Sequence, residues 1–225
     1  LPKTIERIAR RHEWARWAGI VTSEAHSVYD GLGGTTVEQL ELIARYEPLY
    51  SSLVSDCAEA HGLGDRSAAI GLMPYHEQPL RVTVGFAHTL QVHKTDEWVE
   101  IDNLLRAVEA TPEHSVAVVA ADQPANVALW GGLMSTGVVK RGGRGAVVDG
   151  GVRDLHQILP LDFPVWALYR CPLDIRGRAE IASHSKPVKF RGVDVREGDL
   201  VFADANGVVI LPIEAAEDVL ALCEA

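Results

Sequence analysis

Two short apolar segments restrict this chain to a narrow set of folds. "SVAVVAAD" at 115–122 and "GAVVDG" at 145–150 are almost free of polar residues. A strand of this composition is stable where both of its faces are covered, which is typical of central parallel strands. The length and composition of the segment 130–141 between them predict a helix. The pattern therefore predicts an α/β domain with Ala117–Ala121 and Ala146–Val148 buried at the centre of its sheet.

Further predicted elements surround these two strands. We expect strands at 80–92 and 163–169, a helix at 98–110, a hairpin at 199–212 and a closing helix that begins near Pro212. The sequence "DANG" supplies the turn residues of the hairpin. Because strands alternate with helices and hairpins lie nearby, the domain should be of the mixed α/β kind.

The N-terminal region reads differently from the rest of the chain. Residues 1–45 have helical spacing in two stretches, with "GLGG" at 31–34 between them and Thr36 as the cap of the second. Helices of this size bury too little area alone, so we expect them to pack on a neighbour. We therefore predict an N-terminal helical extension at 1–45 and an α/β domain at 46–225.

Composition and charge exclude several classes of protein. Hydrophobic residues make up 47% of the chain, which permits a real core, and the net charge of -10 disfavours nucleic acid as a partner. No stretch approaches the roughly 18 apolar residues that span a membrane. Charges run through the first residues, without the apolar centre of a signal peptide. We expect a cytoplasmic protein that binds neither nucleic acid nor membrane.

Motifs for organic cofactors and for common nucleophiles are absent from the sequence. No G-x-G-x-x-G follows a strand and opens a helix, and neither a Walker loop nor a G-x-S-x-G elbow occurs. The three cysteines form no C-x-x-C pair, which disfavours a zinc site. His88 and His93 are interpreted as ordinary polar or packing residues. We therefore expect no organic cofactor.

The segment 130–158 carries the best candidates for a ligand site. Gly131 and Gly132 allow close approach to the backbone, and the N–H groups of Leu133 and Met134 should lie at a helix start. A helix N-terminus of this kind is suited to bind an anion.

The second half of this segment adds two charges. In "AVVDGGVRDLHQI", Gly150 and Gly151 should permit a sharp turn at the end of a strand, so that Arg153 and Asp154 emerge at the edge where α/β sheets bind ligands. A guanidinium binds a carboxylate or an enolate oxygen, whereas a carboxylate binds a hard divalent cation. Together they would bind a small metal-chelated acid.

A structural interpretation of the same residues stands beside the functional one. Asp154 could simply cap a short helix at Leu155–Ile158, with Arg153 solvated and the glycines serving as turn residues.

Several motifs together resemble one family. Gly132 is followed by 20 residues and then by Arg153–Asp154, within the string "WGGLM…RGGRGAVVDGGVRDLHQI…FPVWA". This string is similar to the RraA-like family, which includes the 4-hydroxy-4-methyl-2-oxoglutarate/4-carboxy-4-hydroxy-2-oxoadipate aldolases. Further similar segments are "LVSDCAEA" at 53–60, "VTVGFAHTL" at 82–90 and "KPVKFRGVDVREGDLVFADANGVVILP" at 186–212. The resemblance covers roughly 50–222 and implies a layered sandwich with a mixed central sheet, of the swivelling β/β/α kind.

The resemblance also implies an activity. Its active members suggest a lyase dependent on Mg²⁺, Mn²⁺ or another divalent metal, which cleaves a 2-oxo acid by retro-aldol reaction or decarboxylates oxaloacetate, and so forms pyruvate in aromatic compound catabolism. Asp154 would bind the metal and Arg153 would stabilise the enolate, while Gly132, Leu133 and Met134 would bind the substrate. Further candidates are Asp149 and Gln157, the latter standing where active members usually have Glu or Asp.

Partners and alternatives follow from the same family. The resemblance implies a homotrimer or homohexamer with a small 2-oxo acid as substrate. One alternative is a non-catalytic regulator that binds a ribonuclease, as the family's namesake does, although members of that type tend to lack the Arg-Asp pair. Another is a family member that acts on a different hydroxy or sugar acid.

Overall fold

The computed structural model describes residues 35–68, 70–78, 80–123 and 126–225. The chain divides into two units, 1–44 and 45–225. The predicted helical extension at 1–45 lies largely outside the described residues, so its first helix and its boundary stay predictions. Its second helix is α3 (Val37–Tyr46). The Thr36 cap is confirmed, because the Thr36 hydroxyl accepts a hydrogen bond from the N–H of Gln39 at 3.3 Å.

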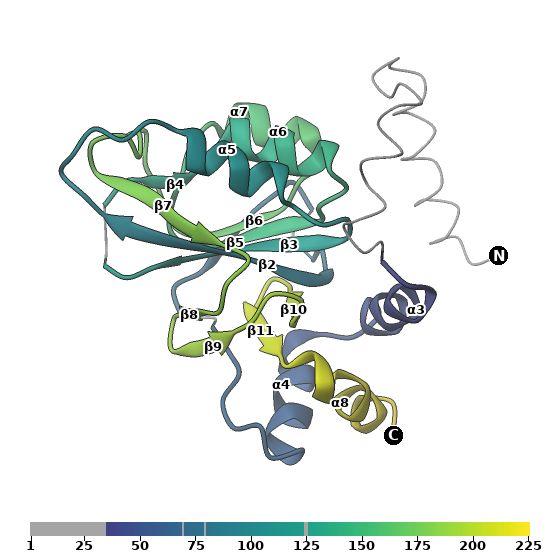
Figure 1. Ribbon diagram of the computed structural model, residues 1–225. Coiled ribbons are helices and arrows are strands. Elements are labelled where there is room, and N and C mark those ends of the chain that lie inside the picture. The colour runs from purple at the N-terminus through teal and green to yellow at the C-terminus, as the bar shows by residue number, and fades with distance from the viewer. Residues whose placement is uncertain (1–34, 69, 79, 124–125) are drawn as a thin grey trace. The chain divides into compact units, whose positions relative to one another are not determined.

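The elements from α4 onward all belong to the second unit (Figure 1). Its α-helices are α4 (Ser51–Ala60), α5 (Asp102–Glu109), α6 (Gly132–Lys140), α7 (Leu155–Ile158) and α8 (Ala216–Cys223). Its strands are β1 (Met73–Tyr75), β2 (Thr83–Lys94), β3 (Ser115–Ala121), β4 (Ala128–Trp130), β5 (Gly145–Val152), β6 (Val165–Arg170), β7 (Ala179–His184), β8 (Val188–Phe190), β9 (Val193–Val195), β10 (Leu200–Ala203) and β11 (Val208–Leu211). No helix within the described ranges is long and apolar enough to cross a membrane.

The main sheet mixes parallel and antiparallel strands, which confirms the predicted fold class. Its order is β1-β6-β5-β3-β2-β10-β11, with β4 paired to β5 and β7 paired to β2. The pairs β2–β3, β3–β5, β5–β6 and β4–β5 are parallel, whereas β1, β7, β10 and β11 join antiparallel. The two apolar strands of the sequence are β3 and β5, and they lie at the centre of the sheet as predicted.

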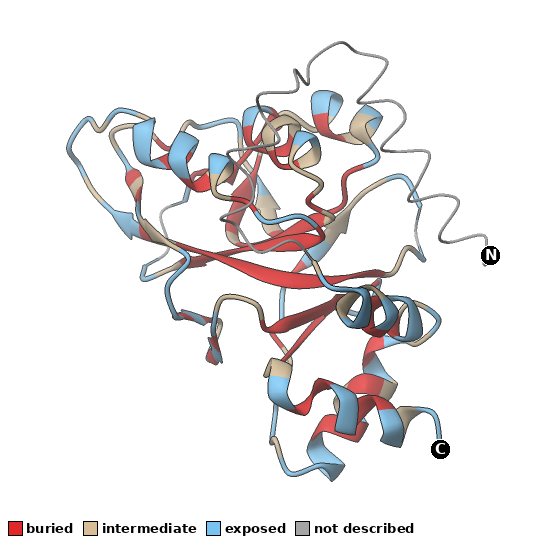
Figure 2. Ribbon diagram, turned by 45° about the vertical axis from the view of Figure 1, so that its right-hand side comes forward, coloured by how far each residue is buried: buried red, intermediate tan, exposed pale blue. Residues whose placement is uncertain are grey.

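Alternating side chains of the central strands fill two separate cores. Ala117 and Val119 belong to a core on one face of the sheet, whereas Val116, Val118 and Ala120 belong to a core on the other face. This alternation follows from the two-residue period of a strand. Figure 2 shows the resulting burial along the strands of the sheet. Both faces are covered, which explains why these strands can be entirely apolar.

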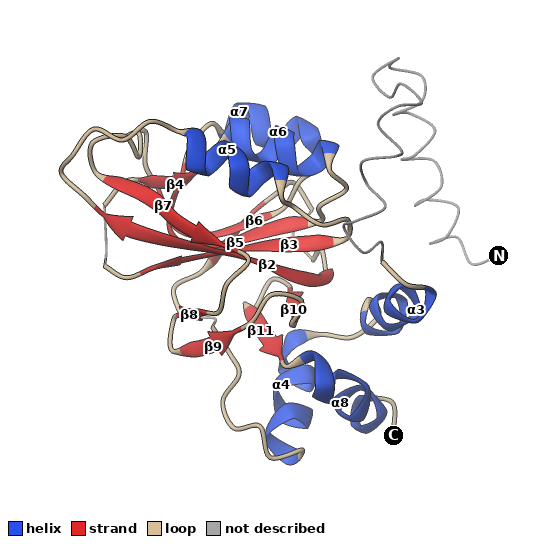
Figure 3. Ribbon diagram, viewed as in Figure 1, coloured by secondary structure: helices blue, strands red, loops and turns tan. Residues whose placement is uncertain are grey.

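Different elements cover the two faces. Helices α5, α6 and α7 lie together on one face (Figures 1 and 3), and Leu104, Met134 and Ile158 carry their apolar sides into the core there. Phe190 and Val195 of the β8–β9 hairpin pack into the opposite core. The result is a layered α/β domain, with three helices on one face of the sheet and the β8–β9 hairpin on the other.

One local prediction is wrong. Gly150 and Gly151 make no sharp turn, because β5 continues to Val152 with a bulge in its pairing to β6 between Val148 and Gly151. A Cβ atom on Gly151 would lie 2.7 Å from the Val127 carbonyl oxygen and 2.7 Å from the Tyr169 ring. The glycine therefore serves the close approach of the neighbouring strands rather than a turn.

A buried polar contact ties the long strand β2 to helix α5. The His88 ring lies with Nδ1 2.9 Å from the Glu197 carboxylate and Nε2 2.8 Å from the Ala107 carbonyl oxygen. The Glu197 carboxylate also accepts a hydrogen bond from the Thr89 N–H at 2.8 Å. Desolvation would raise the pKa of Glu197, but hydrogen bonds from His88 and Thr89 outweigh it and lower that pKa. His88 is a packing residue of the fold, in accord with the sequence interpretation.

We expect the Glu197 contact to stabilise the fold in a pH-dependent way. A carboxyl whose pKa is lowered by folding contributes stability above its unfolded pKa of about 4.3, and that contribution is lost as the pH falls through the lower folded value. Glu197→Gln should therefore reduce the free energy of unfolding by about 2 kcal/mol at pH 7, with a smaller difference below about pH 4. Urea unfolding between pH 3 and pH 7 measures this, with the exposed Glu59→Gln as control. A pH-independent difference would contradict it.

Candidate functional site

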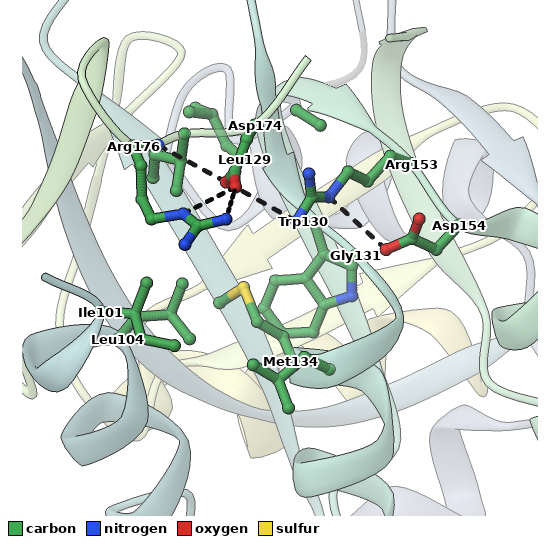
Figure 4. Close-up of a pocket in the computed structure, with 13 residues that line it drawn as sticks. Ile101, Leu104, Leu129, Trp130, Gly131, Met134, Arg153, Asp154, Asp174 and Arg176 are labelled. Atoms are coloured by element: carbon green, nitrogen blue, oxygen red, sulfur yellow. Dashed lines mark hydrogen bonds and ion pairs between the residues drawn. The ribbon is translucent and has the colours of Figure 1, made fainter. Parts of the chain in front are cut away.

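Three loops meet where parallel strands of the sheet end. Strands β4, β5 and β6 run parallel to one another, so their carboxyl ends lie along one edge. The chain continues there into Gly131, into the pair Arg153 and Asp154, and into a loop that carries Asp174 and Arg176. These residues border a cavity of about 170 Å³. Figure 4 shows the charged side chains of Arg153, Asp154, Asp174 and Arg176 on one side of the cavity and an apolar wall of Ile101, Leu104, Trp130 and Met134 on the other.

Gly131 and Gly132 leave the start of α6 bare, so that side chains can lie against it. A Cβ atom on Gly131 would come 3.0 Å from Asp154 Oδ2 and 3.1 Å from Arg153 Cγ. A Cβ atom on Gly132 would overlap the side-chain oxygen of Gln157. Larger residues at these two positions would push the candidate site residues away from the helix start. Other groups do approach the backbone of the glycine pair closely, as predicted. These groups are the protein's own side chains, those of Arg153, Asp154 and Gln157.

Asp154 does not act as a cap of its own helix. It occupies the N-cap position of α7 with φ of 59° and ψ of 35°, and it makes no side-chain capping hydrogen bond there. Its Oδ2 instead accepts a hydrogen bond from the Gly132 N–H at 3.2 Å, which belongs to α6. The left-handed conformation is strained for a residue other than glycine, and such strain is concentrated at functional sites. The structural interpretation of Asp154 as a simple cap is therefore wrong.

The start of α6 also presents two further N–H groups. Leu133 and Met134 follow Gly132 in the first turn, where helical N–H groups have no intrahelical partner. Both residues border the cavity, Met134 as a buried side chain and Leu133 with 57% of its surface exposed. The positive end of the helix dipole lies at the same place. An anion in the cavity could therefore accept hydrogen bonds from this turn.

Arg153 lies between two carboxylates. Its Nε is 3.5 Å from Asp154 Oδ2, and its Nη2 is 3.6 Å from Asp174 Oδ1 (Figure 4). Its backbone N–H donates to the Trp130 carbonyl oxygen at 3.0 Å, which fixes the residue against the end of β4. Arg153 is thus oriented from both sides and is no freely solvated side chain. A guanidinium held in this way is ready to donate to an oxygen atom in the cavity.

The other oxygen of Asp174 binds a second arginine. Arg176 Nε and Nη2 lie 2.8 Å and 2.6 Å from Asp174 Oδ2. Desolvation would raise the pKa of Asp174, but the hydrogen bond from Arg176 and the charge of Arg153 outweigh it, so this pKa is lowered. Asp174 therefore stays ionised at neutral pH and links the two arginines.

The structure brings together most of the residues singled out in the sequence. Gly132, Leu133, Met134, Arg153 and Asp154 all lie around the start of α6.

Two further candidates, Gln157 and Asp149, do not line the cavity. The side chain of Gln157 lies over Gly132. Asp149 is held away from it by an ion pair with Arg191 Nη1 at 2.6 Å. A role for Asp149 in the site therefore has no support from the geometry, whereas Gln157 can affect the site only from its place beside the start of α6.

Asp174 and Arg176 were not singled out in the sequence. They stand in "CPLDIRGR" at 171–178, directly after the strand β6. The rule that ligands bind beyond the carboxyl ends of parallel strands applies to this loop as it does to the loop after β5. Applied to each strand in turn, it would have marked both residues as candidates.

The acidic residues of the cavity fit a hydrated hard cation better than a closed metal site. Among the described residues, no three His, Cys, Asp or Glu side chains converge as metal ligands. Both contacts of Asp154 use Oδ2, which leaves Oδ1 for a cation, whereas Asp174 is engaged by arginines at both oxygens. Mg²⁺ commonly binds through one or two carboxylates and keeps several waters. Asp154 therefore fits as the protein ligand of such an ion, and a tetrahedral zinc site does not fit.

Comparisons with known proteins agree on one family. A model of the RraA-like family, described as Aldolase/RraA, matches residues 51–210. Protein DlpA of Legionella pneumophila is 27% identical over 173 residues, which are 76% of this chain and 27% of DlpA, so the chain spans about a quarter of that relative. A Halalkalibacterium halodurans protein named "Putative 4-hydroxy-4-methyl-2-oxoglutarate aldolase" is 26% identical over 182 residues, 81% of each protein.

Solved structures show the same fold. Streptomyces coelicolor RraAS2, described as an unusual member of the RNase ES inhibitor RraA protein family, is 28% identical with a TM-score of 0.70, covering 80% of this chain and 89% of that one. A structure described under novel cellulases from microbes associated with the gut ecosystem is 28% identical with a TM-score of 0.79, covering 93% of this chain and 95% of that one.

The backbone of Asp154 yields a prediction about stability. Asn adopts the left-handed conformation more readily than Ala, so Asp154→Ala should lower the free energy of unfolding by about 1 kcal/mol more than Asp154→Asn. Urea unfolding of the two variants measures the difference. The same pair of substitutions at Asp162, whose φ is 51°, serves as a control and should show a similar difference. Equal stability of Asp154→Ala and Asp154→Asn would contradict the strain.

Proposed function

The chain belongs to the RraA-like family, and from this premise we propose that it is a lyase that breaks a carbon–carbon bond of a small 2-oxo acid. We further propose that it depends on a divalent cation, Mg²⁺ or Mn²⁺, and that it releases pyruvate. The observation that carries the proposal is the placement of Arg153 and Asp154 against the bare start of α6. There, a carboxylate, a guanidinium and the N–H groups of a helix start adjoin one small cavity.

The helix start would bind the substrate's carboxylate. The N–H groups of Leu133 and Met134 supply donors, and the helix dipole favours a negative charge at this point. The buried side chains of Trp130 and Met134 form the cavity wall beside them. The substrate would thus be held with its 2-oxo group near Arg153.

Arg153 would stabilise the charge that develops as the bond breaks. In the retro-aldol direction the hydroxyl on C4 loses its proton, the C3–C4 bond breaks, and C4 becomes a carbonyl carbon. The electron pair moves to the pyruvate half as an enolate, whose oxygen accepts hydrogen bonds from Arg153. Protonation at C3 then gives pyruvate. Within the described residues no histidine borders the cavity, and water is the proton acceptor that we propose.

Oxaloacetate would follow a shorter course at the same residues. The bond to the departing carboxylate breaks, CO₂ leaves, and the same enolate forms without removal of a hydroxyl proton. A divalent cation held by Asp154 would polarise the 2-oxo group as a Lewis acid in either reaction.

The size of the cavity favours a small substrate. A volume of about 170 Å³ suits an acid of a few carbon atoms, whereas a cellulose chain needs an extended groove. The activity named for the gut-ecosystem structure therefore has no support from this site. The likeness to RraAS2 supports a second candidate, a regulator that binds a ribonuclease. A regulator requires no arrangement of Arg153 and Asp154 at a cavity, so this geometry favours the enzyme.

A coupled assay tests the lyase. Pyruvate should form from oxaloacetate or 4-hydroxy-4-methyl-2-oxoglutarate with Mg²⁺, and a chelator should abolish it. Asp154→Asn should lose activity through cation binding, and Arg153→Lys should lower kcat by about 10² because one oxyanion donor group is altered. Asp194→Asn, on the exposed β8–β9 hairpin, is the control and should keep full turnover.

If Asp154→Asn kept full turnover, the cation role would be wrong. If no 2-oxo acid were cleaved while a ribonuclease was inhibited, the regulator would be supported instead.

Gln157 should limit the affinity for the cation. An acidic side chain at this position would add negative charge beside the start of α6, near the Asp154 carboxylate, whereas an amide does not. Gln157→Glu should therefore lower the Mg²⁺ concentration that gives half-maximal activity by about threefold to tenfold, as one added charge at high effective dielectric predicts. Because Glu and Gln have the same shape, this substitution changes little besides the charge. Gln157→Ala is the control that removes the amide without adding a charge. An unchanged or higher Mg²⁺ requirement in Gln157→Glu would contradict the expectation.

A further inference from the structure

The loop 171–178 places a second positively charged side chain, that of Arg176, at the cavity. Arg176 borders the cavity together with Arg153, and Asp174 lies between the two guanidinium groups (Figure 4). The two arginines come from loops that follow different strands, β5 and β6. A ligand in the cavity can therefore meet a positive charge from each loop.

Arg176 is oriented on two sides and still has free donors. Its Nε and Nη2 bind Asp174, and its guanidinium stacks on the Trp98 ring, 5.2 Å from the ring centroid. An arginine has five N–H groups. Within the described part of the chain, these contacts leave the two N–H groups of Nη1 for a ligand. The carboxylate and the ring hold the side chain in place, which reduces the entropy lost when it binds an anion.

The cavity wall opposite these charged groups is apolar. Ile101, Leu104 and Ile175 border the same cavity. A molecule that matches this lining has acidic groups at both ends and a short, weakly polar middle. A second acidic group without Arg176 would face this apolar wall and lose its hydration without compensation.

On the basis of the proposed function, we propose that Arg176 is the specificity-determining residue for the second carboxylate of the substrate. Arg176 binds the carboxylate remote from the 2-oxo acid end through Nη1. The cavity consequently selects dicarboxylic 2-oxo acids over monocarboxylic ones. A purely structural role of Arg176, as the counter-ion of Asp174, predicts no such selection.

Binding of two matched ligands separates these roles without turnover. 2-Oxoglutarate and 2-oxopentanoate share the 2-oxo acid end and the chain length, and they differ in the remote carboxylate. Neither has the 4-hydroxyl group that retro-aldol cleavage requires. Calorimetric titration of the full chain with Mg²⁺ should give tighter binding of 2-oxoglutarate by about tenfold or more.

Three variants sharpen the test. Arg176→Gln should reduce the preference for 2-oxoglutarate about tenfold and leave the affinity for 2-oxopentanoate unchanged. Arg176→Lys should retain part of the preference, because it keeps the charge but loses the planar donor geometry. Arg170→Gln is the control, since Arg170 also lies over an aromatic ring, that of Tyr75, but borders no part of the cavity. It should behave as the wild type.

The outcomes distinguish this inference from the proposed function. An Arg176→Gln variant that loses affinity for both ligands equally, or for neither, overturns the specificity role. Equal binding of the two ligands by the wild type also overturns it, even if the enzyme cleaves 2-oxo acids. A preference that depends on Arg176 in a protein without cleavage activity supports the inference and refutes the lyase.

Discussion

The site depends on the approach of the Asp154 carboxylate, which follows β5, to the N–H of Gly132 at the start of α6, which follows β4. This contact requires a bare backbone at Gly131 and Gly132 and a left-handed backbone at Asp154. It also requires β4 and β5 to run parallel, so that both of their ends lie at one edge. The helix start, the arginine and the carboxylate are therefore assembled by the sheet rather than by any local motif.

The sequence was sufficient to predict the architecture around this contact. The apolar runs in β3 and β5 admit only a central position, because a strand without polar residues needs cover on both faces. The resemblance to the RraA-like family, carried by Gly132 and the pair Arg153–Asp154, marked the site, and the glycines and charges that it depends on are visible in single residues. The prediction failed at Gly150 and Gly151, where the glycines make room for Val127 and Tyr169 on neighbouring strands.

Asp174 and Arg176 were missed for a related reason. Their place beside Arg153 is set by the pairing of β5 with β6, and only their position directly after a strand distinguishes them in the sequence from solvated loop charges. The ion pair between Asp149 and Arg191 joins residues 42 positions apart, so its effect of holding Asp149 away from the cavity could not be predicted either. Long-range pairs of this kind become apparent only when the strand order is known.

The central claim is that the start of α6 binds the carboxylate end of a 2-oxo acid between Leu133, Met134 and Arg153. Backbone amide chemical shifts during titration with pyruvate and Mg²⁺ test it most directly. The account predicts that the amide signals of Leu133 and Met134 shift in a saturable way, while the signal of Arg191 on the other side of β5 stays in place. Saturable shifts elsewhere, with Leu133 and Met134 unaffected, would contradict it.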